Sequence, residues 1–402
     1  LLAVNESASS IMELSAEGES EIPYLVINAT FSNTEPIQGE EVLVSVNVTD
    51  EAGNPVADAD VRLLVGETPI ALDEVGPGQF TAAIDTSELF GIYVVRIYAE
   101  AEGYIQGMAT YAIRVLDVTP PVAEIFWPLN GSYLRGVQVI RFNGSDRNLE
   151  TIELYIDGEF VATWNTSGIY EYLWDTAVAG DGLHEIRLVV LDKAKNKAEV
   201  RLLVTVDNTP PLAELIWPTD GSILKGQVAI TVRGEDANLG SIELYIDDLL
   251  VAIWVKNGTY VYTWSTSPAI DGWHTIELSV RDKAGNEVVL SARVIVDNTP
   301  PEMKALRWTP RAPRPHQPVS IRVCASDAVS GITNGTLYYH VNGGEWHAVA
   351  MSIRFMGSRT KALLRGTIPG LPRGSVVQFY VVVRDRAGNE ARSPIYLSLI
   401  HI

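Results

Sequence analysis

The stretch Asp282-Lys-Ala-Gly-Asn286, with a strand-like run and Asp297-Asn-Thr-Pro-Pro301 after it, decides the fold of this chain. The pattern also occurs ninety residues earlier, as Asp192-Lys-Ala-Lys-Asn196 and Asp207-Asn-Thr-Pro-Pro211, and its first half returns as Asp385-Arg-Ala-Gly-Asn389. Each copy predicts a strand that ends in Asp, a four-residue turn and a second strand that leads to the next unit. Asp accepts backbone N–H bonds inside such turns, and Gly adopts φ > 0 at no steric cost.

Residues 118–207 and 208–297 form an internal repeat with a spacing of ninety residues. Comparison of the copies separates the two faces of a strand. The residues at positions 186, 188 and 190 are apolar in both copies, whereas those at 187, 189 and 191 are replaced by residues of a different type in the second copy. We therefore expect the first set in the core and the second in solvent. Because Lys195 replaces the Gly of the turn, that turn is expected to be slightly strained or differently shaped.

Short alternating runs, with a turn signal every eight to twelve residues, predict two-sheet sandwiches rather than helices. The expected organisation is a polar, acidic linker or extension at 1–22, followed by four modules and a tail. The boundaries are 23–117 for module 1, 118–207 for module 2, 208–297 for module 3, 298–396 for module 4 and 397–402 for the tail.

The middle repeats resemble the bacterial Ig-like domains that occur in tandem in secreted and surface proteins. The resemblance is carried by Trp127-Pro-Leu-Asn-Gly-Ser132, Ile152-Glu-Leu-Tyr-Ile-Asp157 and Tyr170-Glu-Tyr-Leu-Trp174, with their copies, and by the Asp-x-Ala-Gly-Asn turn. It covers 118–297 well and 298–396 loosely, and module 1 resembles the invasin-type group. The chain lacks the family's cysteines. The resemblance implies an all-β, tandem array of four immunoglobulin-like β-sandwich modules, with a role as spacer or binding module and no conserved chemistry.

Charge is spread unevenly along the chain, whose net charge is −20. Residues 1–117 hold 20 Asp and Glu against 3 Lys and Arg, whereas residues 299–402 hold 5 against 13. The acidic part argues against nucleic acid as a partner. The gradient is compatible with ordinary surface variation, with an anionic glycan or surface as partner, or with head-to-tail self-association. No apolar run has membrane-spanning length.

Catalytic residues are not expected, because no nucleophile, phosphate-binding or dinucleotide motif is present. His184 and His274 occupy equivalent repeat positions, which favours a structural role. Cys324 lies in an alternating run and is interpreted as a buried structural thiol. No cofactor or metal site is predicted. The junction aspartates, such as Asp207 and Asp297, could be interpreted as calcium ligands. They look single in sequence, however, and turn capping is the preferred explanation.

Asn-x-Ser/Thr triplets are the strongest chemical signal and predict N-glycosylation. The alternative is that Asn-Gly turns followed by Ser or Thr arise from turn chemistry alone. The eight asparagines are Asn5, Asn28, Asn47, Asn130, Asn143, Asn165, Asn257 and Asn334.

These observations predict a non-enzymatic extracellular or cell-surface spacer or adhesion array from an archaeal or bacterial source, expected to be a fragment of a larger protein. The alternative is an accessory region of a large secreted hydrolase. A weaker hypothesis is glycan binding by Trp164 and Trp254, treated as exposed. Two interpretations of 397–402 stay open: a non-native tail, because Leu-Ser-Leu-Ile-His-Ile coincides with the product of a common sequencing adapter, or a genuine final strand.

Overall fold

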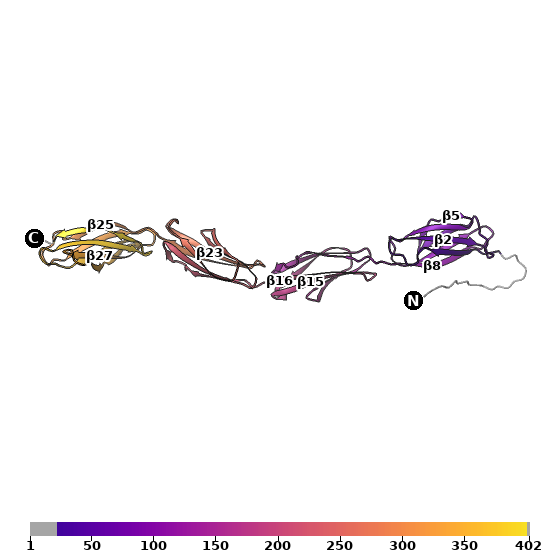
Figure 1. The fold of residues 1–402 in the computed structure, drawn as a ribbon, viewed down its shortest axis with the longest axis horizontal. Helices are drawn as coiled ribbons and strands as arrows, with labels where there is room; N and C mark the ends of the chain where they lie inside the picture. The colour runs from indigo at the N-terminus through magenta and orange to yellow at the C-terminus, as the bar shows by residue number, and fades with distance from the viewer. Residues whose placement is uncertain (1–21, 400–402) are drawn as a thin grey trace. The chain divides into compact units, whose positions relative to one another are not determined.

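The structure, a computed structural model, describes residues 22–399, and strands dominate every part of them (Figure 1). Within this range the one helix is α1 (Thr176–Ala179), and no helix is long and apolar enough to cross a membrane. The chain divides into two compact units. The first holds residues up to 130 with 139–173 and 184–203, and the second holds the rest. Asn5 and most of the predicted 1–22 linker lie outside the described residues.

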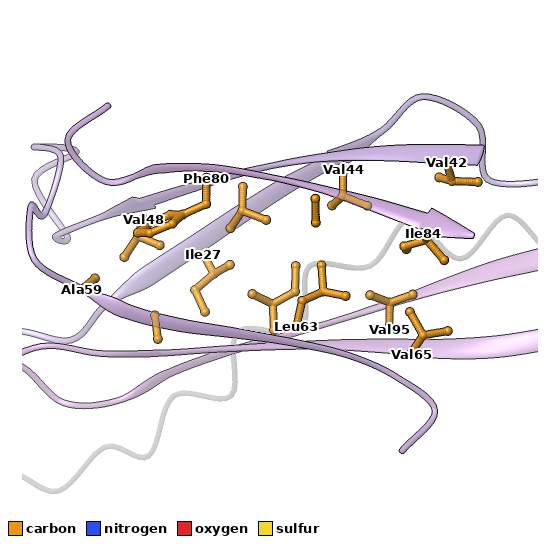
Figure 2. Close-up of a cluster of buried hydrophobic side chains, with 14 of the residues drawn as sticks. Ile27, Val42, Val44, Val48, Ala59, Leu63, Val65, Phe80, Ile84 and Val95 are labelled. Carbon is orange, nitrogen blue, oxygen red and sulfur yellow. The ribbon is translucent and has the colours of Figure 1, made fainter. Parts of the chain in front are cut away.

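Module 1 consists of two four-stranded sheets, with orders β1-β2-β6-β5 and β4-β3-β7-β8. The strands are β1 (Val26–Phe31), β2 (Glu41–Thr49), β3 (Asp60–Val65), β4 (Thr68–Ile70), β5 (Asp73–Gly76), β6 (Gln79–Asp85), β7 (Gly91–Glu100) and β8 (Gly107–Val115). Figure 2 shows the side chains of Val44 and Ile84, from one sheet, pointing towards Leu63 and Val95, from the other. All four are at most 1% exposed, so the alternating pattern of the sequence places one face of each strand in the core.

Modules 2 and 3 repeat one topology, with a three-stranded and a five-stranded sheet each. In module 2 the orders are β14-β11-β9 and β10-β16-β15-β12-β13, and in module 3 they are β17-β19-β22 and β18-β24-β23-β20-β21. Module 2 has β9 (Val122–Trp127), β10 (Tyr133–Leu134), β11 (Val137–Ser145), β12 (Leu149–Ile156), β13 (Glu159–Trp164), β14 (Gly168–Asp175), β15 (Gly182–Asp192) and β16 (Lys197–Val206). Module 3 has β17 (Leu212–Trp217), β18 (Ile223–Leu224), β19 (Gln227–Glu235), β20 (Leu239–Ile246), β21 (Leu249–Trp254), β22 (Gly258–Ser265), β23 (Gly272–Asp282) and β24 (Glu287–Val296).

Module 4 also has two sheets, with one in the order β25-β26-β30-β29 and the other β28-β27-β31-β32, where β33 also pairs with β31. Its strands are β25 (Glu302–Thr309), β26 (Val319–Ser326), β27 (Ile332–Val341), β28 (His347–Ala350), β29 (Ser352–Met356), β30 (Ser358–Ile368), β31 (Val376–Asp385), β32 (Glu390–Arg392) and β33 (Tyr396–Leu399). Strand β33 takes up the first part of the predicted tail, and 400–402 lie outside the described residues.

Equivalent residues of the two repeats occupy the same settings. Trp174 and Trp264 are 7% and 9% exposed, and the residues at 186, 188, 190, 276, 278 and 280 are fully buried. The expectation that 189 and 279 face solvent was wrong, because Val189 and Ser279 are buried on strands that lie between two neighbours. Cys324 is half-buried rather than buried, since Val323 and Ala325 take the core-facing positions of β26.

Candidate functional site

The repeated Asp-x-x-x-Asn turn closes on itself through the Asn side chain. Asn286 donates from its backbone N–H to Asp282 Oδ1 over 2.8 Å, and from Nδ2 to Asp282 Oδ2 over 2.6 Å. The Gly position of the turn has positive φ in all three copies, 91° at Gly285, 80° at Gly388 and 72° at Lys195. The strain expected at Lys195 is therefore present, because a side chain there adopts a backbone conformation that favours glycine.

The same Asn side chain also holds the segment that precedes each Pro-Pro link. Asn286 Nδ2 donates to the Asp207 carbonyl over 2.9 Å, and Asn196 and Asn389 make the same bond, also over 2.9 Å, to the carbonyls of Asp117 and Asp297. One amide thus joins the last turn of a module to the residue that ends the module before it.

Three aspartates gather around each of these bonds, and we call each set a junction cluster. Within each cluster, carboxylate oxygens from the three residues lie within 4.8 Å of one another. The clusters are Asp117, Asp146 and Asp192; Asp207, Asp236 and Asp282; and Asp297, Asp327 and Asp385. The expectation that the junction carboxylates are single was wrong, because the fold brings together residues that are far apart in sequence. The signal available in the sequence was the Asp-x-Asn pair at 146–148, repeated at 236–238.

Hydrogen bonds inside the chain satisfy the buried carboxylates. Asn238 Nδ2 donates to Asp207 Oδ2 over 2.7 Å, and the Thr209 N–H donates to Asp207 Oδ1 over 3.2 Å. At the third cluster, which lacks this Asn, the Ser330 N–H donates to Asp297 Oδ2 over 3.1 Å instead. Turn capping, the role predicted for these residues, is therefore part of their function in the fold.

The electrostatic environment nevertheless disfavours three negative charges in one place. Burial raises the pKa of Asp236 despite the N–H of Asn238, and the charges of Asp207 and Asp282 raise it further. The pKa values of Asp146 and Asp385 are raised in the same way, with burial as the largest cause. Within residues 22–399, no Lys or Arg forms an ion pair with any cluster aspartate. Three converging carboxylate oxygens are the ligand chemistry of a hard divalent cation such as Ca²⁺.

The two repeated histidines are structural, as their repeat positions indicated. His274 Nδ1 lies 2.5 Å from Asp247 Oδ2, and Nε2 lies 2.6 Å from the Ile270 carbonyl oxygen. Both partners are acceptors, so both bonds favour the imidazolium form, which has a proton on each nitrogen. Burial would lower the pKa of His274, but the bonds to Asp247 and Ile270 outweigh it and the pKa is raised. His184 Nδ1 lies 2.6 Å from Asp157 in the same arrangement.

The predicted glycosylation sites that the structure describes lie on strands and turns at the surface. Asn143 is half-buried, and the other six are exposed. Asn28 and Asn47 face each other directly across β1 and β2. Asn257 differs, because its Nδ2, the atom that would carry a glycan, donates to the Asp236 carbonyl over 2.8 Å.

Trp164 and Trp254 are not the exposed platforms that the glycan-binding hypothesis required. Both are half-buried, and their rings pack on Tyr170 and Tyr260 at 5.2 and 4.8 Å between centroids. Each ring pair therefore joins a strand of one sheet to a strand of the other, and the glycan-binding hypothesis is not retained for these residues.

Sheets of this order, packed face to face and repeated along the chain, define an array of immunoglobulin-like β-sandwiches. The family model described as bacterial Ig domain matches residues 121–188 and 211–278. These stretches lie within modules 2 and 3, so both repeats match the bacterial Ig domain, as the sequence resemblance predicted. Curated proteins give no match to the chain.

Several solved structures are similar to long parts of the chain. The ICAM-5 D1–D4 ectodomain fragment is 8% identical with a TM-score of 0.49, and the similarity covers 94% of this chain and 100% of that one. A tetra-tandem repeat from the extending region of a large adhesion protein is 15% identical with a TM-score of 0.34, over 94% of this chain and 99% of that one. A Ca²⁺-stabilized adhesin of an Antarctic bacterium that binds ice is 16% identical with a TM-score of 0.31, over 95% and 100%. At these identities the likeness concerns the fold alone.

Proposed function

We propose that this chain is a non-enzymatic spacer and adhesion array that works outside the cell or at its surface. The observation that carries the proposal is the junction network, which occurs three times with the same Asn-to-carbonyl distance of 2.9 Å. An array that presents a distant binding site needs ordered junctions, whereas an enzyme concentrates its unusual side chains in one cleft. Here the buried polar chemistry lies at the links. Its partners would be other surface proteins or glycans.

Surface labelling of the source cells tests this function. An antibody raised against modules 2 and 3 should label intact cells, and protease added outside should remove the label. A cytoplasmic protein as loading control should survive that treatment. Labelling that appears only after the cells are made permeable would contradict the proposal.

We also propose that the array is N-glycosylated, with Asn28 and Asn47 as the best-placed acceptors. Both side chains are exposed and they stand opposite each other on one sheet face, so glycans there would shield the outward side of β1 and β2. In contrast, Asn257 is held by its bond to Asp236 and should carry no glycan.

Mass spectrometry of the natural protein tests the modification. Peptides that contain Asn28 and Asn47 should carry sugar, with a mass above that of the bare peptide. Asn257 supplies the internal control in the same digest. Unmodified Asn28 and Asn47 peptides from the natural protein would overturn this proposal and leave the spacer function standing.

A further inference from the structure

Module 4 differs from the repeats on the outward side of the sheet β28-β27-β31-β32. Tyr338 and Tyr380 are partners across β27 and β31, and their rings stack with centroids 4.9 Å apart at an angle of 12°. Trp346, 42% exposed in the hairpin before β28, packs its ring against Tyr380 at 4.9 Å and against His340 at 4.5 Å. Arg392 lies over the Tyr380 ring, 3.9 Å from its centroid. We call these five residues the aromatic face.

The equivalent surface of module 2 is closed by charged groups. Counted back from the Asp of the shared turn, Arg187 stands where module 4 has Tyr380, and it pairs with Tyr155. Arg187 lies over the Tyr155 ring and forms an ion pair with Glu199, and the Tyr155 hydroxyl donates to Glu153 over 2.6 Å. Module 2 therefore satisfies this surface internally, whereas module 4 presents aromatic rings there.

Polar groups around the aromatic face favour an anionic ligand. His340 Nδ1 accepts the Gly343 N–H over 3.1 Å, and Nε2 lies 2.9 Å from Gln378 Oε1. In the part of the chain that the structure describes, Arg392 forms no ion pair, since the nearby Glu390 is bonded to Arg384 at 2.6 Å. The hairpin also holds Glu345, but residues 299–402 together carry 13 Lys and Arg against 5 Asp and Glu.

The size of the aromatic face favours a saccharide over a folded protein. Stable protein interfaces bury about 800 Å² and some 20–30 residues on each side, well beyond five side chains. A sugar ring presents an apolar C–H face that fits against an aromatic ring, with hydroxyls at the rim for side chains such as Gln378. A guanidinium recognises carboxylate or sulfate in a two-pronged geometry.

We propose that the aromatic face binds an acidic polysaccharide, with a sugar ring against Trp346 and a carboxylate or sulfate on Arg392. The inference deepens the proposed adhesion function by placing a ligand and its chemistry on module 4.

Binding by the whole chain to matched polymers tests this site. The probes are polygalacturonate with its methyl ester, dextran sulfate with dextran, and hyaluronate, measured by biolayer interferometry at about 0.15 M salt, where long-range attraction is screened. At least one acidic polymer should bind and its neutral counterpart should not. Arg392→Gln and Trp346→Ala should each weaken binding about tenfold, which corresponds to the loss of one charge-assisted contact or one ring contact.

Two variants elsewhere in the chain serve as matched controls. Arg365→Gln removes one charge from β30, on the other sheet of module 4, and Trp273→Ala removes a 57% exposed Trp that has Arg293 over its ring. Both should bind within about twofold of the unchanged chain. Circular dichroism verifies folding, and if Trp346→Ala unfolds the module, the exposed Arg392→Gln decides the outcome.

Three results would overturn the inference: no binding to any acidic polymer, equal loss with Arg365→Gln and Arg392→Gln, or unchanged binding by both face variants. None of these results bears on the cell-surface labelling, so this inference and the proposed function fail separately.

Discussion

Replacement of Asn286 by Ala should weaken module 3 more than any exposed change in the same kind of turn. The Asn286 side chain is 6% exposed and makes three hydrogen bonds: it donates to Asp282 Oδ2 and to the Asp207 carbonyl, and it accepts from Arg135 at 3.2 Å. The Ala variant keeps the two backbone bonds of the turn, in which its N–H donates to Asp282 Oδ1 and its carbonyl accepts from the Asp282 N–H.

The expected loss follows from the two donated bonds. The bond to the buried carboxylate contributes about 1.5–3 kcal/mol and the bond to the carbonyl about 1 kcal/mol, because their acceptors are left without a donor. The free energy of unfolding of module 3 should therefore fall by roughly 2.5–4 kcal/mol. Since 1 kcal/mol shifts the midpoint of a domain of this size by about 4–8 °C, the thermal midpoint should fall by more than about 10 °C.

Asn54 offers a matched control in the same chain. It makes the same two bonds to Asp50, at 2.8 and 3.0 Å, but it is exposed, and among the described residues its side chain is hydrogen-bonded to Asp50 alone. Asn54→Ala should cost less than about 1 kcal/mol, because water replaces the lost donor. Hydrogen exchange followed by mass spectrometry on the whole chain measures both variants. Equal protection of β23 and β24 in the two variants would refute the role assigned to Asn286.

Three further predictions concern packing and charge. Gly234→Ala should destabilise module 3 by about 1–3 kcal/mol, since a Cβ there would lie 2.5 Å from Ile242 Cγ1, whereas Gly168→Ala, where the nearest atom is 3.7 Å away, should be nearly neutral in thermal unfolding. Because the pKa of His274 is raised, its contribution to stability is complete below pH 6.5 and is lost as the pH rises through the folded-state pKa. Urea unfolding followed by Trp fluorescence should show this loss of stability, and the Asp247→Asn variant should lack this pH dependence. Because the pKa of Asp236 is raised, its charged form lowers the free energy of unfolding once the pH rises above 3.8. In calorimetry, Asp236→Asn should therefore raise the thermal midpoint by a few degrees at pH 7 and leave it unchanged near pH 4. A fall in the midpoint at pH 7 would contradict the repulsion inferred for the cluster.

The strands and their faces were predictable from the sequence because the two repeats supplied an internal comparison. Alternation at Val42 and Val44 showed which side of β2 is buried, and invariance at 186 and 276 identified the core of the repeats. The burial of Val189, which points away from the core, was missed, since sequence alone does not show that β15 has a neighbouring strand on each side.

The junction clusters were not predictable in the same way. Asp207, Asp236 and Asp282 are tens of residues apart, and their convergence depends on where three loops end in space rather than on any local spacing. The aromatic face was missed for a related reason, because Tyr338 and Tyr380 become neighbours only through the register of β27 and β31. Trp164 was misjudged as exposed because Tyr170, whose ring packs against it, lies on a strand of the other sheet.

The junction cluster has a consequence for how such chains are assembled and dissected. Each cluster takes one aspartate from the end of one module and two from the next, one in a loop and one at the end of a strand, so neither module contains the complete set. A module that ends in Asp before its proline link can therefore be followed by any module that supplies the other two aspartates of the cluster. Genetic shuffling of such modules would preserve the connection. A cut at the conventional boundary has the opposite effect. A fragment that starts at 208 loses Asp207, whose carbonyl Asn286 binds, and an expression fragment of module 3 should therefore begin before that residue.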